Sequence, residues 1–114
     1  MTGAGDAYRP GVLGDAYSAQ GGWVVAARGE LDQDTLAPLE EALTSAAGRY
    51  PMVVLDAGSI TFGDSSFLNL LLRLHHLTVL RIAAPGEQLR RVFAVTGADT
   101  ILSLHASVEE ALAA

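Results

Sequence analysis

The stretch "MVVLDAGSITFGDSSFLNLLLRLHHLTVLRIAA", residues 52–84, decides the fold class of this chain. Residues 52–55 are continuously apolar and β-branched at their centre, which is typical of a central parallel strand that is covered on both faces. A loop is expected over 56–63, a leucine-rich helix over 65–77 and a second inner strand over 78–84. This order of strand, helix and strand predicts a parallel crossover unit.

The segment before residue 52 predicts an antiparallel hairpin and a helix. Short strands are expected at 16–19 and 23–28, joined by a turn at Gln20 to Gly22, and Gly29 is expected to end the second strand. Apolar residues then recur at helical spacing over residues 36–46, with Thr35 as the expected N-cap.

The segment after residue 84 completes the alternation. It predicts a helix over 87–97 that ends at Gly97, an edge strand over 100–104 and a closing helix that begins near Ser107. The whole chain therefore predicts an α/β domain. Its sheet would be mixed, with four to five strands and about four helices, and the N-terminal hairpin would form the antiparallel edge. Residues 1–14 are expected to form a flexible arm, and residues 15–114 the domain.

Composition excludes several classes of protein. The 114 residues are 50% hydrophobic and carry a net charge of −6, with only seven basic residues. No basic patch is available to neutralise phosphates, so a nucleic-acid partner is not expected. Cysteine is absent, which excludes thiolate metal sites and disulfides. No apolar segment is typical of a signal peptide or a membrane span, so a cytoplasmic protein without membrane insertion is expected.

The helix expected over 65–77 has an unusually wide apolar side. On a helical wheel its apolar arc covers roughly 220°, whereas a surface helix needs only ~100° to face a core. Either the helix is covered on two sides, or part of this arc is left for a partner. Leu68 and Leu72 border the polar side, so they are the pair most expected to be exposed.

The start of this helix allows three interpretations of its hydroxyl residues. Asp64, Ser65 and Ser66 all favour N-cap positions, where a side-chain oxygen accepts a free backbone N–H. The positive end of a helix also tolerates a phosphate, so a serine there can gain about two negative charges without unfolding the chain. The third interpretation is a hydrolase nucleophile, because residues 63–65 spell G-D-S.

The hydrolase interpretation lacks a partner for its nucleophile. A serine nucleophile needs a base, usually a histidine oriented by an aspartate, and no D-x-x-H motif occurs in the chain. His75 lies on the same helix as Ser65, about 15 Å along it. His75 and His76 do not form a metal pair, because adjacent helical residues point about 100° apart. No metal, cofactor or catalytic residue is therefore expected.

Three motifs in order resemble the STAS-domain anti-sigma factor antagonists of bacteria, of the sporulation and general-stress type. The motif "GELDQDT" at residues 29–35 is similar to the G-E-[LI]-D-x-x-T of that family. The motif "ITFGDSSFL" at 60–68 resembles its V-x-[FY]-[MIL]-D-S-[ST]-G-L, and "LRRVFAVTGADTIL" at 89–102 resembles a third conserved segment. The resemblance covers about residues 15–112.

The resemblance implies a partner-switching function without enzymatic activity. In that family an ATP-binding anti-sigma factor of the GHKL type, a serine kinase, phosphorylates the serine after the motif aspartate. The unphosphorylated antagonist binds this kinase and releases a sigma factor, and a serine phosphatase resets the switch. Carried over, the phosphoacceptor is Ser65, with Ser66 as the alternative, and Asp64 is its acidic neighbour. Asp32 takes the place of the "GELD" aspartate, on a loop that lies close to the acceptor in the family.

Two residues depart from the family pattern. Phe67 stands where the family has glycine, and Gly63 stands where the family has a bulky residue. A phenylalanine at this position is expected to obstruct the approach of a kinase loop, and Gly63 adds backbone freedom. The alternative function is a STAS scaffold subunit of a signalling or transporter complex that is never phosphorylated. For either function, the partner-binding residues are expected to be the following: Asp32, Asp34, Asp64, Ser66, Leu68 and Leu72.

Overall fold

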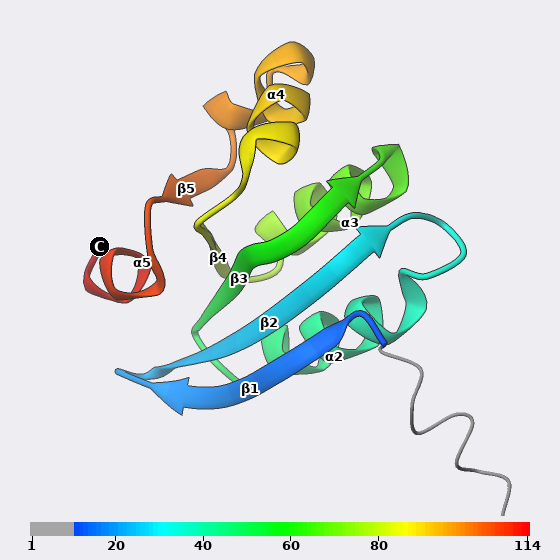
Figure 1. The fold of residues 1–114 in the computed structure, drawn as a ribbon. Helices are drawn as coiled ribbons and strands as arrows, with labels where there is room; N and C mark the ends of the chain where they lie inside the picture. The colour runs from blue at the N-terminus through cyan, green and yellow to red at the C-terminus, as the bar shows by residue number, and fades with distance from the viewer. Residues whose placement is uncertain (1–10) are drawn as a thin grey trace, which may run out of the picture.

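The computed structural model describes residues 11–114, which form a five-stranded mixed sheet with four α-helices (Figure 1). The strand order follows the sequence, β1-β2-β3-β4-β5. The first pair is antiparallel and the other three pairs are parallel. The predicted α/β class and the antiparallel N-terminal hairpin are therefore confirmed. The strands are β1 (Leu13–Ala19), β2 (Gly22–Leu31), β3 (Met52–Gly63), β4 (Val79–Ala83) and β5 (Ser103–His105).

The helices alternate with the parallel strands as the sequence predicts, apart from one short additional turn. A 3₁₀ helix, η1 (Ala98–Thr100), precedes β5 where an extended strand was expected, so β5 is shorter than predicted. The expected end of the preceding helix at Gly97 is confirmed, since this glycine has a left-handed φ of 79°. The α-helices are α2 (Ala37–Ala47), α3 (Ser65–His75), α4 (Glu87–Thr96) and α5 (Val108–Ala113).

The helices cover the sheet unequally. Side chains alternate between the two faces of a strand, so the neighbours Val24 and Val25 belong to different hydrophobic clusters. The larger cluster holds Val25 and the buried side chains of α2, α3 and α4, whereas the smaller one holds Val24 and Ala111 of α5. Three helices thus form the main core on one face, and α5 alone packs on the other (Figure 1).

The loop expected over 56–63 is wrong, because these residues continue β3. They pair with β2, which itself runs to Leu31 and does not end at Gly29. The register of the pair shifts twice, and Gly29 adopts a left-handed φ of 77° at one of these irregularities. Bulges of this kind let a strand that contains glycine and polar residues remain in a sheet. As a result, β3 carries the chain directly to Asp64.

Two further boundaries differ from the prediction. Helix α2 begins at Ala37, not after Thr35, because the Thr35 hydroxyl donates 2.7 Å to the carbonyl of Glu30 and does not cap the helix. The sheet begins at Leu13, so the last residues of the predicted arm lie in or beside β1, and the Val12 carbonyl accepts a hydrogen bond from Arg28. The rest of that arm, residues 1–10, lies outside the described residues.

Candidate functional site

The candidate site begins where the parallel strands β2 and β3 end side by side. Leu31 lies opposite Gly63 in this pair, and the N–H of Asp64 donates a hydrogen bond of 3.2 Å to the carbonyl of Leu31. The two segments that leave these strands therefore start next to each other at one edge of the sheet (Figure 1). The structure thus brings the loop of Asp32 beside the start of α3, which carries Ser65.

Asp64 is the N-cap of α3. Its carboxylate accepts hydrogen bonds from the backbone N–H groups of Ser66, at 2.9 Å, and Phe67, at 3.2 Å. Of the three residues that could cap this helix, the aspartate does so, and neither serine side chain acts as the cap. Ser65 is the first residue of the helix, and its side chain is exposed. Its hydroxyl makes no hydrogen bond within residues 11–114, so it is open to a reagent from solvent.

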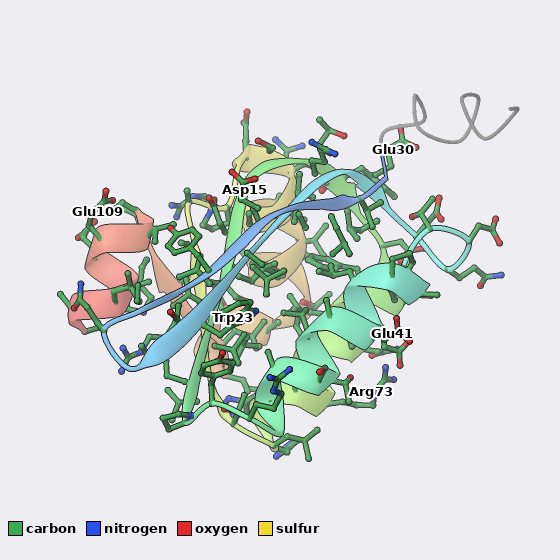
Figure 2. All side chains as sticks on the ribbon, turned by 90° about the horizontal axis from the view of Figure 1, so that it is seen from below. Asp15, Trp23, Glu30, Glu41, Arg73 and Glu109 are labelled. Atoms are coloured by element: carbon green, nitrogen blue, oxygen red, sulfur yellow. The ribbon has the colours of Figure 1, made fainter. Side chains whose placement is uncertain are left out.

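Ser66 faces a groove between the starts of α2 and α3. The groove has a volume of about 350 Å³. Its other lining residues are Gln33, Leu36, Ala37, Glu40, Asn69 and Arg73. An ion pair of 3.1 Å between Arg73 and Glu40 joins the two helices across it, and both side chains are about half exposed, at 58% and 48%. Figure 2 shows Arg73 beside α2, where this pair forms.

The two aspartates of the neighbouring loop have different structural positions. The Oδ1 atom of Asp32 accepts hydrogen bonds from the N–H groups of Asp34 and Thr35, at 2.9 and 3.0 Å. Asp32 therefore folds the loop on itself, in a typical Asx turn. The side chain of Asp34 is exposed and accepts no hydrogen bond from residues 11–114. Asp34 is thus the aspartate of this loop that is available to a partner.

A side chain of helix α4, that of Gln88, bonds the backbone of Gly63, the residue before Asp64. The side-chain amide of Gln88 accepts a hydrogen bond of 3.1 Å from the N–H of Gly63 and faces the Gly63 carbonyl at 3.4 Å. Strand β3 pairs with β4 only as far as Asp56. Beyond that residue, the amide of Gln88 bonds the backbone of β3 in place of a neighbouring strand. Sequence patterns did not indicate Gln88, because the two residues are 25 positions apart and no periodicity links them.

Phe67 does not lie on the approach to Ser65. Its side chain is 1% exposed and belongs to the main core. The expected obstruction by this residue is therefore wrong, because the ring points between the sheet and α3 and not to solvent. The space that it needs is left open by Gly63, which has no side chain.

The apolar residues expected on the surface are corrected in part. Leu68 is 8% exposed and packs in the main core, so it was wrongly placed among the exposed residues, and Leu72 is half-buried against the same core. Both side chains thus pack on the main core, where the isolated helical wheel left them at the border of the polar side. Phe62 is instead the large apolar side chain at the site that remains exposed, at 41%. It was missed because residues 56–63 were expected to form a loop.

The remaining titratable groups form no catalytic arrangement with Ser65 within residues 11–114. No histidine is hydrogen-bonded to it, and the rings of His75 and His76 meet each other edge to face at 5.4 Å. The one serine–histidine contact in this range joins Ser103 to His105 at 2.7 Å on the edge strand β5. Among the same residues, no three metal-ligating side chains gather in one place. None of the described helices is long and apolar enough to cross a membrane.

Comparison with known proteins identifies the same fold. A family model described as "Mlab, STAS domain" matches residues 16–105. No curated protein sequence matches the chain significantly. An anti-sigma factor antagonist from Mycobacterium paratuberculosis is similar in structure, with 28% identity, a TM-score of 0.79 and coverage of 87% of this chain and 89% of that one.

Two structures of SpoIIAA are also similar to this chain. The anti-sigma factor antagonist SpoIIAA in its unphosphorylated form is 22% identical, with a TM-score of 0.69 and coverage of 86% of this chain and 91% of its own. The Bacillus cell fate determinant SpoIIAA in its phosphorylated form is 20% identical, with a TM-score of 0.66 and coverage of 87% and 96%. At these identities the likeness is one of fold.

Proposed function

The chain belongs to the STAS domain family, and on this premise we propose that it is an anti-sigma factor antagonist controlled by phosphorylation of Ser65. In its unphosphorylated form it binds an anti-sigma factor that is also an ATP-dependent serine kinase of the GHKL type. This binding releases a sigma factor. The kinase then modifies Ser65, the complex separates, and a serine phosphatase resets the protein. In this proposal the protein is a substrate and a binding partner in the cytoplasm, and does not act as an enzyme.

The observation that carries this proposal is that Asp64 caps α3, whereas the exposed hydroxyl of the next residue, Ser65, does not. The cap of α3 is supplied by Asp64, so the Ser65 hydroxyl has no structural role that a phosphate would remove. A phosphoryl group on the first residue of the helix would sit at its positive end, where negative charge is favourable. Modification can therefore change the charge of this surface by about two units while the fold stays intact.

The proposed docking face surrounds Ser65 and combines one aromatic anchor with acidic side chains. Phe62 lies three residues before Ser65 and is exposed, and aromatic side chains often supply much of the energy of an interface. Asp34 and the groove at Ser66 lie on the α2 side. A face of this charge would meet a basic partner surface. A phosphate on Ser65 would add charge that must be desolvated in the complex, and the complex would dissociate.

The structural neighbours support the switch without testing it in this chain. SpoIIAA has been solved in unphosphorylated and phosphorylated forms, so the fold tolerates that modification in SpoIIAA. The buried position of Phe67 removes the one steric objection to the same reaction here.

A second candidate function is a STAS scaffold subunit that is not phosphorylated. It is favoured by the family model that matches residues 16–105, because that model is described by the name Mlab and not as an anti-sigma factor antagonist. Such a subunit would use the same exposed face for binding, without turnover by a kinase.

Intact mass, with fragmentation that localises the site, would separate the two functions. The protein is isolated from its host in growth and in stress, beside the variants Ser65→Ala and Ser66→Ala. The switch predicts a phosphoryl group whose occupancy differs between the two conditions and which only Ser65→Ala abolishes. Loss in Ser66→Ala alone would move the acceptor to Ser66. An unmodified chain in both conditions would favour the scaffold function.

A pull-down with the same host lysate tests the docking step. The immobilised Ser65→Ala variant should capture an ATP-binding protein from the lysate. The Ser65→Asp variant should not, because its carboxylate supplies part of the charge of a phosphate. Equal capture by both variants would contradict the proposed mechanism of release.

A further inference from the structure

A separate cavity lies at the other end of the sheet from Ser65. It is formed between the sheet face of β1 and β2 and the last turns of α2. Trp23, at the start of β2, is one of its walls, whereas Leu31 and the candidate site are at the end of that strand. Nothing in the switch described above uses this part of the molecule.

The cavity exists because small residues meet where larger ones would fill the space. Ala16 of β1 and Ala42 and Ala46 of α2 line it, and its volume is about 290 Å³. The size is near the lower limit for small-molecule sites, which are mostly apolar with a few polar groups at the rim. The site thus suits a small ligand with an apolar body.

Two aromatic rings form one side of the cavity. Trp23 and Tyr50 are stacked with 5.0 Å between ring centroids and 16° between planes. Figure 2 shows Trp23 beside β1 and β2, near α2. Rings fixed in this way offer a flat, apolar surface that a ligand can cover with little loss of side-chain entropy.

A single cation stands at the rim. Arg49 lines the cavity directly after α2, and its guanidinium makes no hydrogen bond or ion pair within residues 11–114. Every other arginine of these residues has such a partner: Arg28 the Gly11 carbonyl, Arg73 Glu40, Arg81 the Ala111 carbonyl, Arg90 the Pro85 carbonyl and Arg91 Glu87. In a chain of net charge −6, Arg49 is the exception that an anion would complement.

We propose that this cavity binds a small amphiphile with one apolar chain and a carboxylate head group. The apolar chain of the ligand lies against Trp23 and the alanines of α2, and its carboxylate accepts hydrogen bonds from Arg49 at the rim. A guanidinium pairs with a carboxylate through two parallel hydrogen bonds, which gives the site its preference for an acid over an alcohol. This binding is independent of the proposed phosphorylation of Ser65.

The test uses sodium octanoate as the probe and the fluorescence of Trp23 as the signal, because Trp23 is the one tryptophan of the chain. The full-length protein is titrated below the concentration at which octanoate forms micelles, with 1-octanol as the uncharged ligand. We expect a saturable change with octanoate and roughly tenfold weaker binding of octanol. Arg49→Gln should bring octanoate to the affinity of octanol. Arg91→Gln, on α4, is the matched control and should change nothing.

A second variant tests the location. Ala42→Leu fills the cavity from α2 with a residue that favours helix, so it should weaken octanoate and octanol alike by roughly tenfold or more. The melting temperature shows that each variant is folded. The proposal is overturned if the wild-type protein gives no saturable change, if Arg49→Gln binds octanoate as the wild type does, or if the folded Ala42→Leu variant does so.

Discussion

The ring of Phe67 occupies the space that a side chain at Gly63 would need. A Cβ atom built on Gly63 would lie 2.5 Å from Cδ2 of Phe67 and 2.8 Å from Cδ2 of Leu89. The STAS pattern that this segment resembles has a bulky residue at the first position and a glycine at the second. The two departures of this chain are therefore one exchange of volume between neighbouring positions in the core.

The exchange predicts strong coupling between the two residues. Gly63→Leu alone should destabilise the protein by about 1–3 kcal/mol through overpacking, and Phe67→Gly alone by at least about 3–5 kcal/mol through the cavity that it leaves. The double variant should be less destabilised than the sum of the two by more than about 1 kcal/mol. Urea denaturation of the four proteins measures this cycle. Simple additivity would show that the two side chains do not share one space.

The neighbours Asp64 and Ser65 should respond in opposite ways to substitution. Asp64→Ala removes the cap of α3 and should cost about 0.5–2 kcal/mol. Ser65→Asp puts a charge at the positive end of the same helix and should be neutral or stabilising by about 0.3–1 kcal/mol. Thermal melting of both variants checks the pair. A loss of stability in Ser65→Asp as large as that in Asp64→Ala would contradict the claim that the Ser65 side chain does not stabilise the fold.

These relationships show which features can be predicted from the sequence. The order of helices and strands could be predicted, because each depends on a local period, such as the apolar spacing of the helix at 65–77 or the run at 52–55. The extension of β3 could not, because its polar and glycine residues are held by pairing with β2. The burial of Leu68 was missed for a similar reason, since it depends on how α3 packs into the main core and not on the period of the helix alone.

At the site, the sequence indicated the right segment but not the role of each residue. Asp64, Ser65 and Ser66 are equivalent as caps by composition, and only the backbone geometry assigns the cap to Asp64. Gln88 had no signal at all, since a side-chain amide that bonds a distant backbone leaves no pattern in sequence.

Gln88 should control the local stability of the segment before Ser65. Gln88→Ala removes the acceptor for the N–H of Gly63, and within residues 11–114 no strand pairs with this side of β3 there. We expect faster hydrogen exchange at Gly63 by roughly tenfold, which corresponds to about 1.4 kcal/mol. Glu87→Ala is the control, because Glu87 only forms an exposed ion pair with Arg91. Equal exchange at Gly63 in both variants would mean that the amide of Gln88 does not hold this strand end.

The aspartates of the β2–α2 loop should separate stability from binding. Both were expected to contact a partner, yet the Asp32 carboxylate accepts two hydrogen bonds inside the loop and that of Asp34 accepts none from residues 11–114. Asp32→Ala should therefore cost about 0.5–1.5 kcal/mol, because it removes the acceptor of the Asp34 N–H and one of the two acceptors of the Thr35 N–H, the other being the Asp32 backbone carbonyl. Asp32→Asn should cost less, since its amide oxygen still accepts.

Asp34→Ala should leave stability within about 0.5 kcal/mol of the wild type, as exposed substitutions usually do. If the proposed docking face is right, the same change should weaken capture of the partner from host lysate and make the remaining capture less sensitive to salt, because a rim charge acts mainly through long-range attraction. Denaturation and pull-down on the three variants give both readouts. A loss of stability in Asp34→Ala with unchanged capture would show that Asp34 stabilises the fold and does not belong to the docking face.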